Sequence, residues 1–220
     1  MDFDGARARL VADLRQSRFI KDDMVADAML KVPREQFVPR SMREEAYTDS
    51  PLSIGSGQTI SAPHMVAIMV EASQLKSGHK VLEIGAGSGY HAAVVAELVR
   101  PGGRVFTVER VASLAKFAGD NINRTGYGNT VQIICGDGSN GLPEEAPFDR
   151  IFVACAAPDV PMPLKAQLAD GGRLLVPVGG RYFQKLMLVE RKGSKFNQED
   201  LGGCVFVPLI GEHGYRTSSM

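Results

Sequence analysis

The segment VLEIGAGSGY at 81–90 constrains the fold more than any other part of the sequence. An apolar, partly β-branched run precedes three closely spaced glycines, and an alanine- and valine-rich segment follows at 92–98. These runs are typical of a buried parallel strand and of the helix packed beside it. Glycines keep the turn between them sharp and open, and a helix that begins at about Gly89 directs its free N–H groups there. The segment therefore predicts a nucleotide-type cofactor site.

The spacing of the glycines distinguishes between cofactors. A dinucleotide fingerprint has the pattern Gly-x-Gly-x-x-Gly, whereas this chain has Glu-x-Gly-x-Gly-x-Gly. The acidic Glu83 would repel a pyrophosphate but suits the ammonium and sulfonium groups of S-adenosylmethionine. We therefore favour S-adenosylmethionine over NAD, and we expect it to be bound by Glu83 and by the loop residues Gly85, Ala86, Gly87, Ser88 and Gly89.

Two further acids follow at predicted strand ends. The run RVFTVE ends in Glu109, where nucleoside-binding α/β folds place the acid that accepts both ribose hydroxyls. The run VQIIC leads into Gly-Asp-Gly at 136–138, a loop that can approach an adenine closely. Each acid alone would also suit a solvated strand end or a turn. Because the features occur in the expected order, we predict that Glu109 binds the ribose and that Asp137 and Gly138 bind the adenine.

Alternating strand and helix patterns predict the fold class. They place strands at 81–84, 104–109, 131–135, 150–154 and 173–178, and helices at 111–125 and near 163–169. This alternation is typical of a doubly wound, mostly parallel, Rossmann-like α/β sheet. Two more strand patterns, at 184–191 and 204–209, are separated by a segment too short for a crossover helix. We therefore expect an antiparallel pair at the C-terminal edge of the sheet.

The first 75 residues differ in character from the rest. Apolar residues at helical spacing predict helices over 3–14 and 24–32, the second capped by Asp22 or Asp23. The prolines that follow interrupt any helix, and we expect a loop region as far as Thr59. We interpret 1–75 as a helical extension and 76–220 as the α/β core of a single domain.

Composition excludes several classes of protein. The chain has 220 residues, 44% of them hydrophobic, which is enough for one large core. Its 25 basic and 25 acidic residues form no long basic run, so nucleic-acid binding is disfavoured. A charged N-terminus and the lack of an apolar stretch of about 18–20 residues indicate a cytoplasmic protein. Cys135, Cys155 and Cys204 are odd in number and far apart, and we expect buried free thiols, neither disulfides nor a metal site.

Several segments together resemble the protein-L-isoaspartate (D-aspartate) O-methyltransferases over nearly the whole chain. The most specific is GSGQTISAPH at 55–64, a signature of that family. The glycine segment, the Gly-Asp-Gly loop and ADGGRL at 169–174 are shared more widely among class I S-adenosylmethionine-dependent methyltransferases. VPREQFVP at 32–39 and FVPL at 206–209 are further segments typical of the family. Val205 is a departure, because many members have arginine there.

The resemblance implies a protein-repair reaction. Members of the family transfer the methyl group of S-adenosylmethionine to the α-carboxylate of L-isoaspartyl residues, and of D-aspartyl residues, in damaged proteins. S-adenosylhomocysteine is released, and the ester collapses through a succinimide that can reopen to aspartate. A carboxylate is already ionised near pH 7, so the enzyme has to align and desolvate the reactants. We expect no catalytic base and no metal, damaged proteins and peptides as partners, and a monomeric enzyme.

The resemblance also assigns residues in the signature segment. Ser61 corresponds to the family's active-site serine, and its hydroxyl can donate a hydrogen bond to the substrate carboxylate. On the residues alone, Ser61 suits a helix cap better, because Pro63 follows closely. Gln58 and Thr59 in the same loop are expected to form the wall of the cofactor or substrate site. His64 is expected to contact the methionyl end of the cofactor.

Three alternatives remain open. A class I methyltransferase could act on RNA, a small molecule or a different carboxylate, although the Asn/Asp-Pro-Pro-aromatic segment typical of nucleobase amine methylation is replaced by ACAAP at 154–158. A NAD-dependent oxidoreductase would need the glycine spacing that is missing here. A non-enzymatic binding module with the same fold would be indicated by loss of the Ser61 loop or of Glu109, and both are present.

Overall fold

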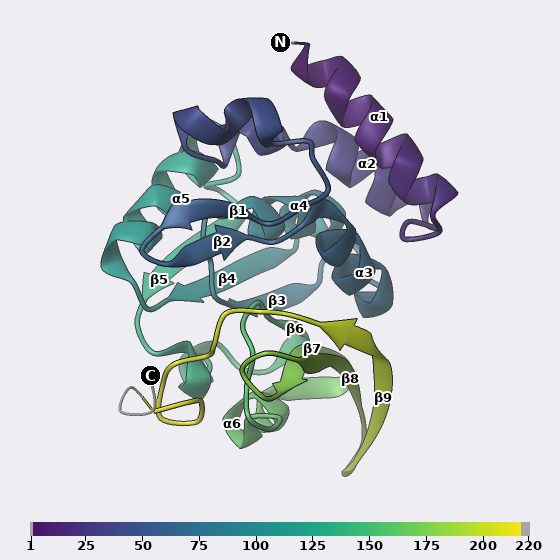
Figure 1. Cartoon of the computed structure of the whole chain (residues 1–220). Helices are drawn as coiled ribbons and strands as arrows, with labels where there is room; N and C mark the ends of the chain where they lie inside the picture. Colours follow the sequence, from purple (N-terminus) through teal and green to yellow (C-terminus); the bar gives the residue numbers. More distant parts are fainter. Residues whose placement is uncertain (1, 217–220) are drawn as a thin grey trace.

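The computed structural model describes residues 2–216, and its main feature is a mixed seven-stranded sheet in the order β5-β4-β3-β6-β7-β8-β9 (Figure 1). Five strands run parallel, and β8 and β9 extend the sheet antiparallel beyond β7. The strand bounds are β3 Lys80–Ile84, β4 Arg104–Glu109, β5 Val131–Cys135, β6 Phe148–Val153, β7 Leu168–Gly179, β8 Gln184–Lys192 and β9 Lys195–Cys204. This arrangement confirms the predicted Rossmann-like fold.

The two faces of the sheet are buried in two apolar clusters. Val81 and Val105 point toward helices α3, α4 and α5, whereas Leu82 and Phe106 point toward the short helix α6 on the opposite face. Successive strand residues alternate between the faces, and both sides of the parallel strands are therefore apolar. The helix bounds are α3 Pro63–Ser73, α4 Tyr90–Val99, α5 Ala112–Arg124 and α6 Met162–Ala166. No helix within 2–216 is long and apolar enough to cross a membrane.

The two N-terminal helices form as predicted. They are α1 Phe3–Gln16 and α2 Asp23–Lys31. The carboxylate of Asp22 caps α2 by accepting a hydrogen bond from Met24 N at 2.8 Å, which satisfies one of the free N–H groups at the helix start. Helix α2 packs against α4, and Figure 1 shows α1 on the outer side of α2. The N-terminal segment thus forms one side of the molecule above the α4 layer.

A short hairpin occupies part of the region that we expected to be a loop. Strands β1 Leu52–Gly55 and β2 Gln58–Ile60 pair antiparallel, and 3₁₀ turns η1 Arg34–Gln36 and η2 Arg40–Glu45 precede them. Each strand has three or four residues, too few for an alternating pattern to stand out in the sequence. The hairpin lies above the carboxyl ends of β3 and β4 (Figure 1).

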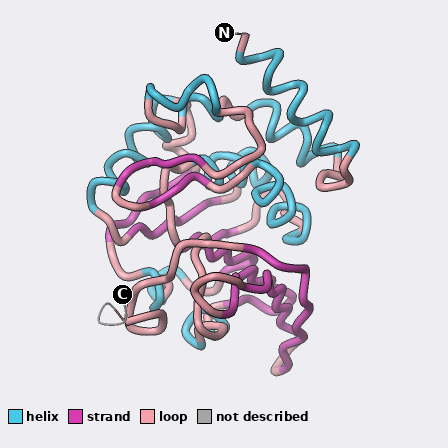
Figure 2. Tube along the Cα trace, viewed as in Figure 1, coloured by secondary structure: helices cyan, strands magenta, loops and turns pink. Residues whose placement is uncertain are grey.

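The predicted strand at 204–209 was wrong. The partner of β8 is β9, which ends at Cys204 and is exposed at most of its positions. Because β9 is a polar edge strand, it lacks the apolar alternation by which strands are recognised. Residues 205–210, here called the strap, continue as a loop back across the sheet (Figure 2). The strap is held on Ala156, whose N donates to Val207 O at 2.8 Å and whose O accepts from Leu209 N at 2.7 Å.

Other bounds and one cysteine differ from expectation. Helix α6 is shorter than predicted, and β7 begins at Leu168, five residues before the predicted start at 173. All three cysteines are free, and Cys155 and Cys204 are buried as expected. Cys135, however, is exposed. It is the last residue of β5, an edge strand of the sheet that is paired on one side only, with β4.

Candidate active site

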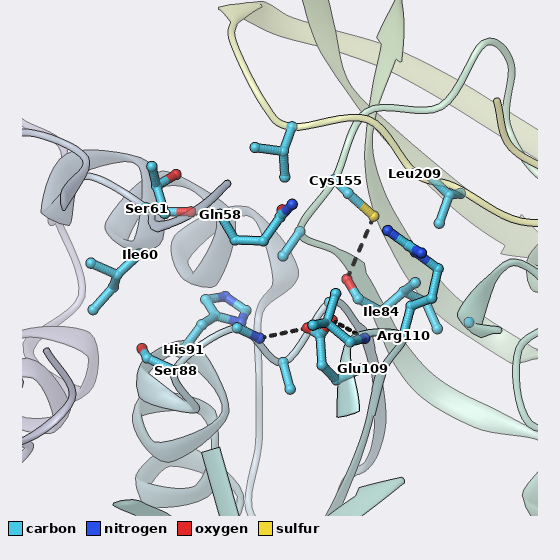
Figure 3. Close-up of a pocket in the computed structure, with 18 of the residues that line it drawn as sticks. Gln58, Ile60, Ser61, Ile84, Ser88, His91, Glu109, Arg110, Cys155 and Leu209 are labelled. Carbon is cyan, nitrogen blue, oxygen red and sulfur yellow. Dashed lines mark hydrogen bonds between the residues drawn. The ribbon is translucent and has the colours of Figure 1, made fainter. Parts of the chain in front are cut away.

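An open cavity lies at the carboxyl ends of β3, β4 and β6 (Figure 3). It contains about 940 Å³ of empty space, including its mouth. Strands β3 and β6 are neighbours although they are far apart in the chain, and such a switch in strand order is where open α/β sheets bind ligands. The polypeptide segments that line it are residues 58–61, the glycine loop, the ends of β4 and β6, Gly138 and the strap.

The glycine loop lies in the wall of this cavity as predicted. Gly85, Ala86, Gly87 and Ser88 line it, and Gly85 N is held by Val108 O at 2.8 Å. Gly89 does not line the cavity but forms the N-cap of α4 with a φ of 86°. A Cβ on Gly89 would lie 3.1 Å from Ile122 in α5, so glycine is needed here for both conformation and packing. The loop thus leaves the N-terminus of α4 open toward the cavity.

Glu109 lies in the cavity wall at the end of β4. Its Oε2 accepts a hydrogen bond from Gly87 N at 3.0 Å, and its Oε1 accepts one from Val111 N at 2.9 Å. The side chain is largely buried, yet each carboxylate oxygen has a further lone pair. Glu109 therefore holds the glycine loop to β4 and can still accept hydrogen bonds from a ligand.

Glu83 lies beneath the cavity and does not line it. Its carboxylate is 1% exposed and accepts hydrogen bonds from Thr107 Oγ1 and His91 Nδ1, both at 2.6 Å. His91 does line the cavity, and its Nε2 is buried without a hydrogen-bond partner among residues 2–216. The sequence indicated Glu83 but not His91. Because side chains alternate along a strand, Glu83 lies on the face of the sheet that α4 covers. A buried acid on that face needs a polar partner in the first turn of α4, and this need could have identified His91.

Replacing His91 by leucine should lower the free energy of unfolding by about 3 kcal/mol, because it removes one partner of a fully buried carboxylate. Urea denaturation of the purified protein measures this. In the double variant Glu83→Leu/His91→Leu, much of the loss should be recovered, since no buried carboxylate remains. A His91→Leu protein as stable as the parent would show that the Glu83–His91 contact contributes nothing to stability.

The Ser61 loop forms the opposite wall of the cavity. Gln58, Thr59 and Ser61 all line it, and Figure 3 shows Ser61 and Gln58 across the cavity from Glu109. Within 2–216 the Ser61 hydroxyl makes no hydrogen bond. The N-cap of α3 is Ala62, which has no side-chain cap, so the helix-cap interpretation of Ser61 is wrong. The hydroxyl is available to a ligand.

Arg34 holds this loop from behind, and sequence reasoning did not assign it a role. Its Nη2 donates to Ser61 O and its Nε to Ala46 O, both at 2.8 Å. Its guanidinium lies over the ring of Tyr90, 4.8 Å from the centroid, and Tyr90 lines the cavity. Burial lowers the pKa of Arg34 from its ordinary value, although an arginine remains charged in proteins. The sequence signalled this residue only as part of a family segment.

His64 does not reach the cavity. Asp49 Oδ1 lies 2.9 Å from both His64 N and His64 Nδ1, and the imidazole packs against Phe19, with the ring centroids 5.4 Å apart. These contacts connect the start of α3 to the preceding loop. The structure therefore places His64 beside the Ser61 loop as a supporting residue, away from the predicted contact with the methionyl end of a cofactor.

Asp137 is also outside the cavity, although its neighbour Gly138 lines it. The Asp137 carboxylate accepts hydrogen bonds from Ser139 N at 2.8 Å and Glu212 N at 2.9 Å. Partial burial by itself would raise the pKa of Asp137, but the hydrogen bonds from Glu212 and Ser139 outweigh it and lower the pKa below its ordinary value. In this structure Asp137 anchors the segment that follows the strap.

Replacing Asp137 by alanine should speed amide hydrogen exchange at Glu212 about tenfold near pH 7, because the amide loses a charged acceptor. A lowered pKa means that this contact is complete above the ordinary Asp pKa and is lost as the pH falls through the lowered value. The difference between parent and variant should therefore shrink in strong acid. Mass spectrometry of the C-terminal peptide measures both effects. Equal exchange near pH 7 would contradict the anchoring role.

The part of the wall formed by the strap and Cys155 is apolar, and the charged Arg110 lines the cavity beside Glu109. Residues 207–210 of the strap and Cys155 line it, and burial raises the pKa of the Cys155 thiol well above its ordinary value. A neutral, buried thiol behaves as a small hydrophobic group, so Cys155 contributes apolar surface to the cavity. Val205, where the family resemblance breaks, is 71% exposed and lies outside the lining.

Fold and site together define a class. A glycine loop at the switch point of a parallel sheet, with an acid at the end of the next strand, is the arrangement of Rossmann-like methyltransferases that use S-adenosylmethionine. Within that class, the family model for protein-L-isoaspartate(D-aspartate) O-methyltransferase matches residues 6–214. The chain belongs to the protein-L-isoaspartate (D-aspartate) O-methyltransferase family.

Individual relatives agree with this assignment. The chain is 57% identical to a protein-L-isoaspartate O-methyltransferase of Methanopyrus kandleri, over 97% of this chain and 95% of the relative. It is 53% identical to one of Hyperthermus butylicus, over 97% and 92% of the two chains. A Plasmodium falciparum protein assigned to the same activity, solved in complex with S-adenosyl-L-homocysteine, superimposes with a TM-score of 0.83 at 30% identity and covers 93% of this chain and 98% of its own.

Proposed function

We propose that this protein transfers the methyl group of S-adenosylmethionine to the free α-carboxylate of L-isoaspartyl residues, and of D-aspartyl residues, in damaged proteins. One observation carries the proposal beyond family membership. A single cavity is bounded on one side by the glycine loop with Glu109 and on the other by the unbonded hydroxyl of Ser61. The two ends suit a nucleoside-type donor and an anionic acceptor, and the protein initiates repair of its substrate to aspartyl.

The cavity residues fit S-adenosylmethionine, which supplies an activated methyl group when bound. Glu109 has lone pairs for the ribose hydroxyls. Gly138 lines the neighbouring wall, where a Cβ would lie 2.6 Å from the side chain of Ile84. We assign the methionyl end to the glycine loop and His91, with Glu83 acting through His91. His64 and Asp137 are not assigned to the cofactor, because neither lines the cavity. Gln58 and Thr59 line it and remain candidate contacts of the cofactor or the substrate.

Ser61 is the residue that we assign to the acceptor. Its hydroxyl would donate a hydrogen bond to one carboxylate oxygen and leave the other free to attack the methyl carbon in line with the leaving sulfur. A carboxylate needs no base near pH 7, and this chemistry does not call for a metal ion. The strap and the β1–β2 hairpin cover the cavity from two sides and would exclude water from the reacting groups.

The same proposal covers the organisation of the chain. Residues 1–75 would serve as a helical extension that supplies the substrate loop, and 76–220 as the α/β core that binds the cofactor. The balanced charge of the sequence favours a partner that is a damaged protein or peptide over a nucleic acid. We expect a monomer that acts in the cytoplasm.

A labelling assay tests the function directly. The protein is incubated with methyl-labelled S-adenosylmethionine and a pair of peptides that differ only in aspartyl versus isoaspartyl at one position. We expect base-labile label on the isoaspartyl peptide alone. Equal labelling of both peptides, or of neither, would contradict the proposed acceptor, whereas binding of S-adenosylhomocysteine in a separate titration would still support the cofactor.

A further inference from the structure

Arg34 carries a fully buried positive charge with no acid among the described residues in direct contact, and the Asp49 carboxylate acts on it only from a longer range. Its exposed fraction is 0%, and no carboxylate of residues 2–216 lies within 4.0 Å of its guanidinium. Two backbone carbonyls and the side chain of Tyr90 are its close partners, and Nη1 has no hydrogen-bond partner among residues 2–216. Because burying a charge without a counter-charge is costly, the folded protein retains this arginine at the expense of stability.

The acid next to Arg34 in the sequence is paired with other residues. Glu35 follows Arg34 directly, but its carboxylate is engaged elsewhere: Tyr47 Oη donates to Glu35 Oε2 at 2.5 Å, and Arg7 Nη2 lies 3.5 Å from the same atom. Arg7 is therefore paired with an acid, whereas Arg34 is left with neutral acceptors.

The position of this charge relates it to the acceptor site. Arg34 donates to the carbonyl of Ser61, the residue whose hydroxyl faces the cavity. The ring that lies under the guanidinium, Tyr90, is itself part of the cavity wall. The positive charge thus lies immediately behind the loop on which an anionic group would be held, in surroundings that screen it poorly.

We propose that Arg34 is a positioning and specificity-determining residue whose buried charge is balanced by the α-carboxylate of the substrate at Ser61. It would favour an ionised acceptor over a neutral one of the same shape, and its hydrogen bond would keep the Ser61 loop in place. This inference rests on the proposed function and adds to it the reason that the site selects a carboxylate. Two opposite charges separated by one layer of protein backbone attract each other strongly enough to favour a carboxylate acceptor at least tenfold over a neutral one.

The test measures peptide binding in place of turnover. Two peptides are compared, one with an isoaspartyl α-carboxylate and one with an α-carboxamide at the same position, on protein saturated with S-adenosylhomocysteine. The parent should prefer the carboxylate peptide. Arg34→Met should reduce that preference at least tenfold, Arg34→Lys should retain much of it, and affinity for S-adenosylhomocysteine should change less than twofold in both variants. A preference is a ratio, so a partly unfolded sample does not alter it.

Arg150→Met is the matched control. Arg150 is also buried and also donates to carbonyls, those of Ser73, Asp149 and Gln74, but it lies at the start of the paired segment of β6, away from the cavity. Its replacement should leave the preference unchanged. Equal loss of affinity for both peptides in Arg34→Met, an unchanged preference, or an Arg34→Lys protein no better than Arg34→Met would overturn the inference. Failure of the parent to methylate an isoaspartyl peptide would instead contradict the proposed function.

Discussion

Replacing Ser61 by alanine should lower kcat/KM for an isoaspartyl peptide about 100-fold, with affinity for S-adenosylhomocysteine changed less than twofold. A hydrogen bond from a neutral hydroxyl to a charged acceptor contributes about 1.5–3 kcal/mol, and the upper part of that range corresponds to about 100-fold in rate. The Ser61 hydroxyl lines the cavity and makes no hydrogen bond within 2–216. Its whole contribution should therefore appear in the reaction.

Stability separates this role from a structural one. Ala62, and not Ser61, is the N-cap of α3, so Ser61→Ala should leave the thermal midpoint unchanged. Ser53 provides a matched control, because it is an exposed serine of the adjoining hairpin that does not line the cavity. Ser53→Ala should alter neither rate nor stability. A Ser61→Ala protein with the parent's turnover would remove Ser61 from the mechanism.

The parts of the site built from the backbone could be predicted from sequence. Strand ends in a parallel sheet converge at one edge, so apolar runs followed by glycines and an acid were sufficient to place the glycine loop and Glu109 in one cavity. Both depend on local sequence and on the order of elements. The same logic placed Asp137 close to the cavity but could not show that Glu212, 75 residues later, supplies a hydrogen bond to its carboxylate.

Other features depended on contacts that local patterns do not encode. A charged residue is expected at the surface, so nothing in the segment around Arg34 indicated that its guanidinium is fully buried behind Ser61. His91 likewise became recognisable only when the sheet placed Glu83 beneath α4. Strand β9 was missed for a related reason: as an exposed edge strand it is specified by its pairing with β8, and its own composition is polar.

Replacing Glu109 by alanine should weaken the binding of S-adenosylhomocysteine about 100-fold, which calorimetric titration can measure. A carboxylate that accepts from both ribose hydroxyls makes two charge-assisted hydrogen bonds, each worth about 1.5–3 kcal/mol, and part of this is offset by water that would solvate the ligand in the variant. Glu109 also accepts from Gly87 N and Val111 N, so the variant removes an acceptor that orders the glycine loop before the ligand arrives. Both effects act on cofactor affinity.

A ligand that lacks the 2′-hydroxyl distinguishes the ribose contact from ordering of the loop. The parent should bind 2′-deoxy-S-adenosylhomocysteine more weakly than the normal ligand, because one charge-assisted hydrogen bond is missing. In Glu109→Ala the two ligands should bind almost equally, since the acceptor for that hydroxyl is already gone. Glu97→Ala, at the far end of α4 and outside the cavity, should discriminate between them as the parent does. If Glu109→Ala kept the parent's discrimination, the carboxylate would act on the glycine loop alone and the ribose assignment would be wrong.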